Sequence, residues 1–204
     1  MIRPFGEAAL LVELETSDRA QALAASLRHD PLPGVIEAVP GLSSLLVELD
    51  PLVAERASVI SSLEQRLFAP DDPTPVPGSQ HTIRVTYDGP DLDEVASLTG
   101  LTSAAVTELH STAELRVLFC GFAPGFAYLG DLPPQLHVPR LATPRTRTPS
   151  GSVAIAGAMS AIYPAELPGG WRVIGHTSVS PFDPTGDPPA LLVPGDRVRF
   201  VPIR

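Results

Sequence analysis

Proline and glycine recur every few residues from Arg116 to the end of the chain, and this spacing keeps every regular element there short. Both residues interrupt helices, and proline cannot supply the backbone N–H that a central strand needs. Strand-forming runs fit between these breakers at residues 116–122, 152–156, 161–163, 171–176 and 196–201. Many short strands separated by turn-forming residues are typical of a β-barrel or a β-sandwich.

The first 70 residues show longer periodic segments. Leu10, Val12 and Leu14 alternate with other residues, as in a half-buried strand. The expected elements are a strand around these residues, a helix capped by Ser17, strands at 35–39 and 44–49, and a helix from 53 to 67. This β-α-β-β-α order predicts a small sheet covered by helices on one side.

The segment APDDPTPVPGSQ, residues 69–80, separates the two patterns. It contains four prolines and two acidic residues, a composition typical of a linker. The sequence therefore predicts an α+β fold in two domains, a small N-terminal α/β domain at residues 1–78 and a β-barrel domain at 79–204.

Residues 91–110 follow a predicted strand at 83–87 and interrupt the β pattern. Asp91 and Glu94 have capping-box spacing, and Gly100 separates two short helical runs, as in a helix-turn-helix. The segment carries four acidic residues and no arginine, so it lacks the side chains that contact phosphates or guanine edges. We therefore expect a helical excursion that packs on the β domain.

The charge of the chain excludes several functions. Its 204 residues carry a net charge of −9, which argues against nucleic acid or an anionic membrane as a partner. All 14 basic residues are arginine. Without lysine there is no phosphate loop of the Walker type, no Schiff base and no lysine-activated serine.

Several features bear on the compartment. The sequence has no apolar run of about 18 residues and no signal-peptide pattern at its start. Its single cysteine, Cys120, fits a reducing environment. We expect a cytoplasmic protein without a membrane span.

The segment CGFAPGFAYLG, residues 120–130, gathers aromatic side chains around chain breakers. Phe122, Phe126 and Tyr128 have even spacing and share a face of an extended chain, while Pro124-Gly125 bends it. One interpretation is an aromatic wall for a planar or apolar ligand, or for a partner surface. The alternative is an aromatic core layer at a kinked strand.

A second candidate site is the arginine-rich segment PRLATPRTRTPSGS, residues 139–152. Arginine favours carboxylate or phosphate, and Ser150-Gly151-Ser152 could complete an anion-binding turn. We expect Arg140 and Arg145 to converge on one anion site, the alternative being a solvated or acid-paired loop. Trp171 follows Gly169-Gly170, and closing the barrel is its simplest role.

The catalytic set is incomplete at the sequence level. The five histidines show no metal-ligand spacing, so no metal is expected. His110 and His176 are candidate acid–base groups, with a surface or core role as the alternative for each. Ser152 lies outside any G-x-S-x-G nucleophile motif.

These motifs together resemble the family that comprises allophanate hydrolase subunit 1, the B subunit of 5-oxoprolinase (PxpB) and the kinase inhibitor KipI. The matching segments run in order over residues 81–204: GFAPGFAYLG at 121–130, the prolines and arginines of 139–145, GSVAIAG at 151–157, IYP at 162–164, PGGW at 168–171 and PGDRVRF at 194–200. The resemblance implies a C-terminal cyclophilin-like β-barrel and one half of a carboxyltransferase-type module.

The resemblance also implies a function and a site. The chain would be a subunit, inactive by itself, of a heteromeric ATP-dependent amide hydrolase, most simply a 5-oxoprolinase that opens a small cyclic amide. Its partners would be an allophanate hydrolase subunit 2 (PxpC-like) protein and a LamB/YcsF-type (PxpA-like) protein, and ATP would serve the complex. The implied substrate-binding residues are Phe122, Pro124, Gly125, Phe126, Tyr128, Arg140, Arg145, Ser152, Met159, Tyr163 and Trp171.

Two other functions stay open. One is a KipI-like regulatory module that inhibits a histidine kinase, and the other is a carboxyltransferase half that serves biotin chemistry. The chain departs from the family pattern at Met159-Ser160-Ala161, where Gln-Thr-Gly is usual, and at Leu115, Ser150 and His176, where Tyr, Ala and Arg are usual. Loss of the glutamine amide predicts an altered substrate.

Overall fold

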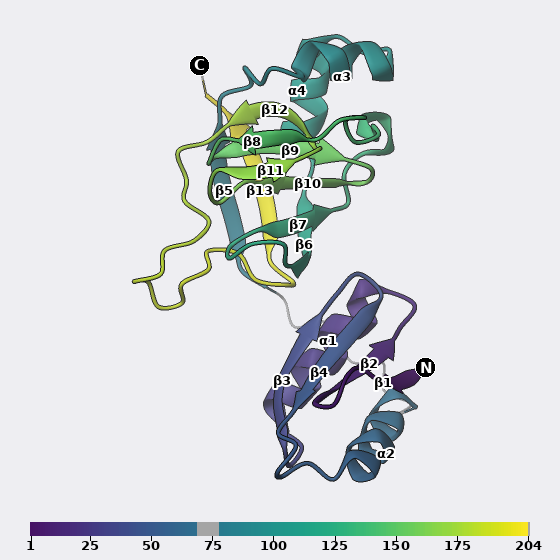
Figure 1. The fold of residues 1–204 in the computed structure, drawn as a ribbon. Coiled ribbons are helices and arrows are strands. Elements are labelled where there is room, and N and C mark those ends of the chain that lie inside the picture. The colour runs from purple at the N-terminus through teal and green to yellow at the C-terminus, as the bar shows by residue number, and fades with distance from the viewer. Residues whose placement is uncertain (69–77, 204) are drawn as a thin grey trace. The chain divides into compact units, whose positions relative to one another are not determined.

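The computed structural model describes residues 1–68 and 78–203, and the chain divides into two compact units, Met1–Pro77 and Gly78–Arg204. Figure 1 shows the helices and strands of both units. The predicted α+β class is confirmed, because the first unit mixes helices with a sheet and the second is mainly β. Most of the predicted linker, residues 69–77, lies outside the described residues.

The N-terminal unit is a four-stranded antiparallel sheet in the order β1-β2-β4-β3. Its elements are β1 (Ile2–Pro4), β2 (Ala9–Glu13), α1 (Ser17–His29), β3 (Val35–Pro40), β4 (Ser44–Leu49) and α2 (Arg56–Leu67). Alternating strand residues point to one face, where they form a single core with both helices: Leu10, Val12, Leu45, Val47 and Leu49 from the sheet, and Leu23, Leu27, Val59 and Leu63 from the helices.

The start of α1 differs from the prediction by one residue. Thr16 occupies the N-cap, and its Oγ1 accepts a hydrogen bond from the Arg19 backbone N–H at 3.3 Å. Ser17, the predicted cap, is the first helical residue and is buried. The hydroxyl of Thr or Ser can cap a helix, but the cap residue needs a non-helical backbone, and Thr16 is the one with an extended backbone.

The C-terminal unit is a nearly closed barrel. Its seven-stranded sheet has the order β12-β9-β10-β7-β6-β13-β5, in which only β13 and β5 pair in parallel. Two hydrogen bonds between Thr86 and His176, at 2.9 and 2.8 Å, link the chain after β5 to the end of β12 and so join the two edges. The strands are β5 (Gln80–Val85), β6 (Leu115–Cys120), β7 (Ala127–Gly130), β9 (Ser152–Ala156), β10 (Met159–Ile162), β12 (Arg172–His176) and β13 (Arg197–Pro202).

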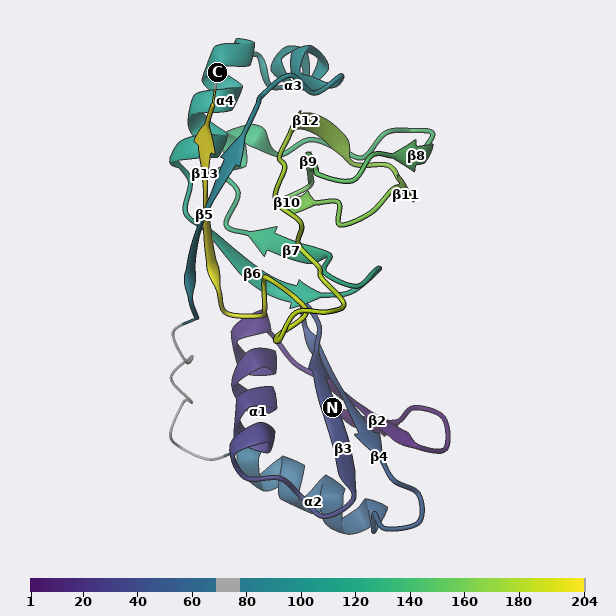
Figure 2. The same ribbon diagram turned by 90° about the vertical axis from the view of Figure 1, so that its left-hand side faces the viewer.

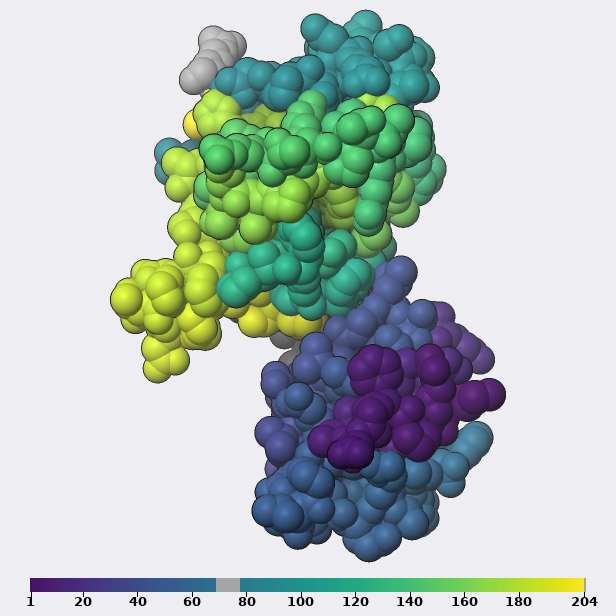
Figure 3. Space-filling view, viewed as in Figure 1, coloured from purple at the N-terminus to yellow at the C-terminus, as the bar shows by residue number. Residues whose placement is uncertain are grey.

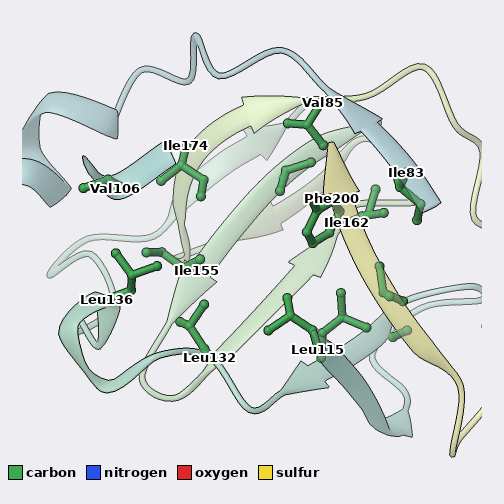
Figure 4. Packing of buried hydrophobic residues seen from close by; sticks show 14 of the residues in the cluster. Ile83, Val85, Val106, Leu115, Leu132, Leu136, Ile155, Ile162, Ile174 and Phe200 are labelled. Atoms are coloured by element: carbon green, nitrogen blue, oxygen red, sulfur yellow. The ribbon is translucent and has the colours of Figure 1, made fainter. Parts of the chain in front are cut away.

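One face of this sheet encloses the main core. Alternate residues of every strand meet there, among them Ile83, Leu115, Ile155, Ile162 and Phe200 (Figure 4). The opposite face of β9, β10 and β12 is also buried, in a second, aromatic-rich cluster. Because both faces of these strands are covered, their sequences are nearly continuous hydrophobic runs and do not alternate between hydrophobic and polar residues.

The helical excursion consists of α3 (Leu92–Thr99) and α4 (Ser103–Thr112), which contribute Val95 and Val106 to the barrel core. Gly100 ends α3 in the left-handed conformation, with φ +69°. The predicted capping box is wrong: Asp91 occupies the N-cap position but its side chain makes no cap bond. Its carboxylate instead bonds Arg145 and the Val173 backbone N–H.

Several strands were not predicted from the sequence. The strand predicted at 116–122 ends at Cys120, and β7 then completes a hairpin (Figure 2). A two-stranded ribbon of β8 (Arg145–Thr148) and β11 (Leu167–Gly169) was also missed. A short 3-10 turn at Pro134–Leu136 precedes the ribbon, and the long loop at residues 177–196 stands out from the barrel in the space-filling view (Figure 3).

No helix in the described ranges 1–68 and 78–203 is both long and apolar enough to cross a membrane.

Candidate functional site

The aromatic segment 120–130 forms the end of the β6–β7 hairpin. Two backbone hydrogen bonds close its tip, from Gly121 N to the Phe126 carbonyl at 3.1 Å and from Phe126 N to the Ala123 carbonyl at 3.0 Å. Phe122 has a φ of +72°, which is unusual for a bulky residue. Pro124 and Gly125 therefore lie in a tight, strained hairpin tip and not in a kinked strand.

Phe126 lies at the centre of what we call the aromatic cluster, defined by Phe122, Phe126, Tyr128, Tyr163 and Trp171. The other four rings approach Phe126 with centroid distances of 5.3, 5.0, 5.4 and 5.9 Å, all in edge-to-face geometry. Four residues with small or flexible side chains, Ala154, Ala156, Ala161 and Met159, pack against these rings.

The aromatic cluster combines both interpretations of the sequence. Phe126, Tyr163 and Trp171 are buried and form a core layer. Tyr128 is half-buried, and Phe122 is 60% exposed at the hairpin tip. The cluster therefore has a packed interior and an apolar outer edge that a ligand or partner can reach.

Arg140 lies over this edge. Its guanidinium carbon is 5.9 Å from the centroid of the Trp171 ring, within the range of a cation–π interaction. Burial raises the pKa of Tyr128, and the charge of Arg140 lowers it in part. The arrangement offers a positive charge beside aromatic rings, which suits an anionic group attached to a small ring or chain.

Arg145 has a different partner. Its Nη2 donates to Asp91 Oδ1 at 2.5 Å, and its Nη1 lies 3.5 Å from the Trp171 carbonyl. Burial raises the pKa of Tyr163, and the charges of Arg140 and Arg145 both lower it. Both arginines thus lie within electrostatic range of the Tyr163 hydroxyl, and their convergence on one anion stays a prediction.

The sequence of this chain matches a known protein family. The family model of the carboxyltransferase domain, subdomains C and D, matches residues 1–192.

The chain belongs to this family.

Two relatives and one solved structure are similar to this chain over nearly its full length. It is 44% identical to the B subunit of the 5-oxoprolinase of Escherichia coli O157:H7 over 97% of this chain and 93% of that protein. It is 35% identical to the B subunit of the 5-oxoprolinase of Bacillus subtilis strain 168, over 99% and 92% of the two chains. The crystal structure of TTHA0988 superposes with a TM-score of 0.85 at 37% identity and covers 100% of this chain, which spans 40% of TTHA0988. The family resemblance drawn from the motifs is confirmed.

Within this carboxyltransferase-domain fold, His110 is a core residue. Its side chain is fully buried on α4, where it stacks on Phe200 with a centroid distance of 4.7 Å. Nδ1 lies 2.7 Å from the Tyr87 hydroxyl and Nε2 lies 2.9 Å from Ser160 Oγ. Burial lowers the pKa of His110 to about 3. Because the ring is buried and both nitrogens have partners, the structure favours the core role of His110 over the acid–base role.

His176 is exposed at the end of β12. Its Nδ1 lies 2.7 Å from Asp88 Oδ1, and the side chain is 57% exposed. Ser152, another predicted site residue, is its direct neighbour on β9. Neither residue contributes to the aromatic cluster, so the predicted residues divide between two places on the barrel.

Two acidic residues were missed as site residues. Asp88 follows the strand predicted at 83–87 and was not singled out, and Asp91 was predicted only as a helix cap. Asp91 is buried, and its second carboxylate oxygen accepts the Val173 backbone N–H at 2.7 Å. No local signal marks such residues, since their partners lie 88 and 54 positions away in the chain.

Cys120 is not an activated nucleophile. Burial and, to a lesser extent, the charge of Asp196 raise the pKa of its thiol to about 11. At neutral pH the group is therefore a protonated thiol, and its Sγ lies 3.7 Å from the Leu192 carbonyl.

Proposed function

We propose that this chain is a subunit of a cytoplasmic, heteromeric, ATP-dependent amide hydrolase of the 5-oxoprolinase type, and that it has no activity by itself. The observation that carries the proposal is the 44% identity to the B subunit of a 5-oxoprolinase over nearly the full length of both proteins. The substrate class is a small cyclic amide with a carboxylate.

The side-chain inventory supports a role shared with another polypeptide. The chain has no lysine, His110 is sequestered in the core, and the thiol of Cys120 stays protonated at neutral pH. TTHA0988 contains this fold within a longer polypeptide, of which the present chain spans 40%. We infer that an allophanate hydrolase subunit 2 (PxpC-like) protein supplies the missing part here, with a LamB/YcsF-type (PxpA-like) protein as a third component.

The aromatic cluster is the proposed contact surface for the partner subunit. Phe122 is 60% exposed beside the half-buried Tyr128, and contiguous exposed apolar surface commonly marks an interface. Arg140 adds a positive charge over the Trp171 ring at this edge, where it can pair with an acidic group of the partner. A stable contact should bury more than the roughly 1,600 Å² of a standard interface.

The charges of the barrel unit disfavour a triphosphate at two places. A triphosphate is commonly bound by several cations or at a helix N-terminus. Within residues 78–203, Arg145 pairs with Asp91 and Arg147 with Glu166, and the first turn of α3 carries Asp93 and Glu94. We therefore assign ATP to a partner subunit.

Co-expression with the subunit 2 and LamB/YcsF-type proteins encoded in the same genome tests the proposal. We expect the tagged chain to co-elute with its partners in size-exclusion chromatography at micromolar concentration. The complex should convert 5-oxoproline to glutamate with ATP, and the chain alone should not.

Phe122→Ser should weaken co-elution, while Leu98→Ser, at another exposed apolar position on the same unit, should not. Turnover by the isolated chain would contradict the shared site. Separate elution of the chains would favour a stand-alone regulatory module.

A further inference from the structure

A pocket lies on the barrel unit, apart from the aromatic cluster. It has a volume of about 420 Å³ and lies between the loop after β5, the turn after β8 and the ends of β9 and β12. The residues in its wall that can bind or exchange protons are Asp88, Arg145, Thr148, Ser150, Ser152 and His176. None of the five residues of the aromatic cluster lines it.

The Asp88–His176 pair fixes the orientation of the imidazole in this pocket. In the neutral ring, Nδ1–H donates to Asp88 Oδ1 across 2.7 Å, so Nε2 keeps its lone pair as an acceptor. The backbone of His176 is held by the two hydrogen bonds to Thr86 that join the barrel edges. The imidazole is therefore anchored at both its backbone and its Nδ1 atom, although its side chain is 57% exposed.

Ser152 faces His176 across the sheet. The two residues are direct partners in the antiparallel β12–β9 pair, and the hydrogen bond from Thr177 N to the Gly151 carbonyl, at 2.9 Å, flanks them. That pattern marks a non-hydrogen-bonded pair, in which side chains stand closest. A ligand on Nε2 thus also meets the Ser152 hydroxyl.

Arg145 supplies a positioned cation to the lining of the pocket. A guanidinium has five N–H donors. One N–H of Nη2 donates to Asp91 and one N–H of Nη1 donates to the Trp171 carbonyl, so three donors remain. Asp91 is in turn fixed by the Val173 backbone N–H. The arginine is therefore held in place and retains donors for a ligand.

The charges select the kind of ligand. Arg145 carries the only fixed positive charge among the pocket-lining residues, which also include Asp88, and Arg145 pairs with Asp91. A phosphate dianion would face two carboxylates, whereas a single carboxylate needs only the arginine fork. The Nε2 lone pair can accept an N–H from the same ligand.

We propose that this pocket binds a small monocarboxylate that carries an N–H group, with Arg145 pairing with the carboxylate and His176 Nε2 accepting the N–H. The cyclic amide of an amino acid has both groups. The choice of 5-oxoproline as the probe rests on the proposed function, but the site itself rests on the geometry of this chain.

Direct binding to the purified full-length chain, without partners or ATP, tests the proposal. We expect 5-oxoproline to give saturable binding by calorimetry and to shift the His176 ring signals in NMR spectra. Two ring analogues serve as matched ligands: cyclopentanecarboxylate lacks the N–H, and 2-pyrrolidinone lacks the carboxylate. Each should bind about tenfold more weakly, the effect of one hydrogen bond or ion pair near a surface.

Variants separate the pocket from the rest of the chain. His176→Ala should weaken 5-oxoproline binding about tenfold, and Asp88→Asn should weaken it less, because it only frees the ring. Both side chains are more than half exposed, so the variants should fold. The matched control is His29→Ala, an exposed histidine at the end of α1, which should bind as the parent chain does.

Several results would overturn the proposal: no saturable binding, equal binding of cyclopentanecarboxylate, tighter binding of inorganic phosphate, or unchanged binding by His176→Ala. These outcomes do not depend on the complex. If the complex turns over 5-oxoproline while the isolated chain binds none, only the pocket proposal fails. If the isolated chain binds it while the complex is inactive, only the proposed function fails.

Discussion

Among single residues, His110 and His176 show how burial assigns a role to one side-chain type. His110 lies in the barrel core between the Tyr87 hydroxyl and Ser160 Oγ, where the neutral ring serves as a two-ended hydrogen-bonding group. His176 lies at a strand end, where one nitrogen is held by Asp88 and the ring stays accessible. The first histidine supports packing, and the second is free to meet a ligand.

The burial of His110 predicts a specific acid sensitivity. Its folded-state pKa is lowered from 6.5 to about 3, so between these values the unfolded chain binds a proton there that the folded chain does not. The stability from neutral His110 is complete above pH 6.5 and is lost as the pH falls towards 3. We expect the free energy of unfolding in urea to fall by a few kcal/mol more between about pH 7 and pH 4 than in His110→Gln. His29→Gln should follow the parent chain, and parallel curves for His110→Gln would contradict the prediction.

Among the structural elements, the β6–β7 hairpin shows why its glycines differ. Gly125 has a φ of +79°, and a Cβ there would lie 2.6 Å from Phe182 Cβ and 2.9 Å from the Pro181 carbonyl oxygen. Gly121, at the other side of the same tip, has no positive φ, and a Cβ added there would meet no heavy atom within 4 Å. The backbone conformation and the close neighbours of Gly125 require glycine there, and those of Gly121 do not.

We therefore expect Gly125→Ala to lower the free energy of unfolding by about 1–3 kcal/mol, through left-handed strain and contact with backbone. Gly121→Ala, the matched control, should change it by less than about 0.5 kcal/mol. Trp171 fluorescence during urea unfolding measures the stability of both variants. Trp171 is the only tryptophan of the sequence, and its ring centroid lies 5.9 Å from that of Phe126 at the hairpin. Equal effects of the two substitutions would refute the assignment.

In the molecule as a whole, the two units have separate cores. Residues of the N-terminal unit form one hydrophobic cluster, and the barrel unit contains two others. A unit with its own core has what independent folding requires.

We expect residues 78–204, expressed alone, to unfold cooperatively in urea and to bury Trp171 as the full chain does. The position of the fluorescence maximum and the sharpness of the transition measure this. A spectrum typical of exposed tryptophan, or a broad transition, would show that the barrel needs the N-terminal unit.

Local features of this protein could be read from its sequence alone. Pro and Gly spacing predicted short strands, and β9 was placed at its observed bounds, Ser152–Ala156. The periodic segments before residue 70 predicted the helices and three of the four strands of the first sheet. The ordered motifs identified the family, and the spacing of Phe122, Phe126 and Tyr128 indicated an aromatic cluster. The family rests on the order of motifs along residues 81–204, and each of the other signals depends on neighbours within about ten positions, where steric preference and burial period act.

The meeting of distant residues depends instead on how the barrel closes. Asp91 and Arg145 are 54 positions apart, and Asp88 and His176 are 88 apart, yet each pair forms a hydrogen-bonded contact. Closure of the barrel at Thr86 and His176 brings Asp88 to His176, and the separate β8–β11 ribbon carries Arg145 to Asp91. The register of the barrel is set by the packing of all seven strands at once. The periodicity of one segment contains no information on that register. For this reason the arginine and the histidine could be found in the sequence, but not the carboxylates that hold them.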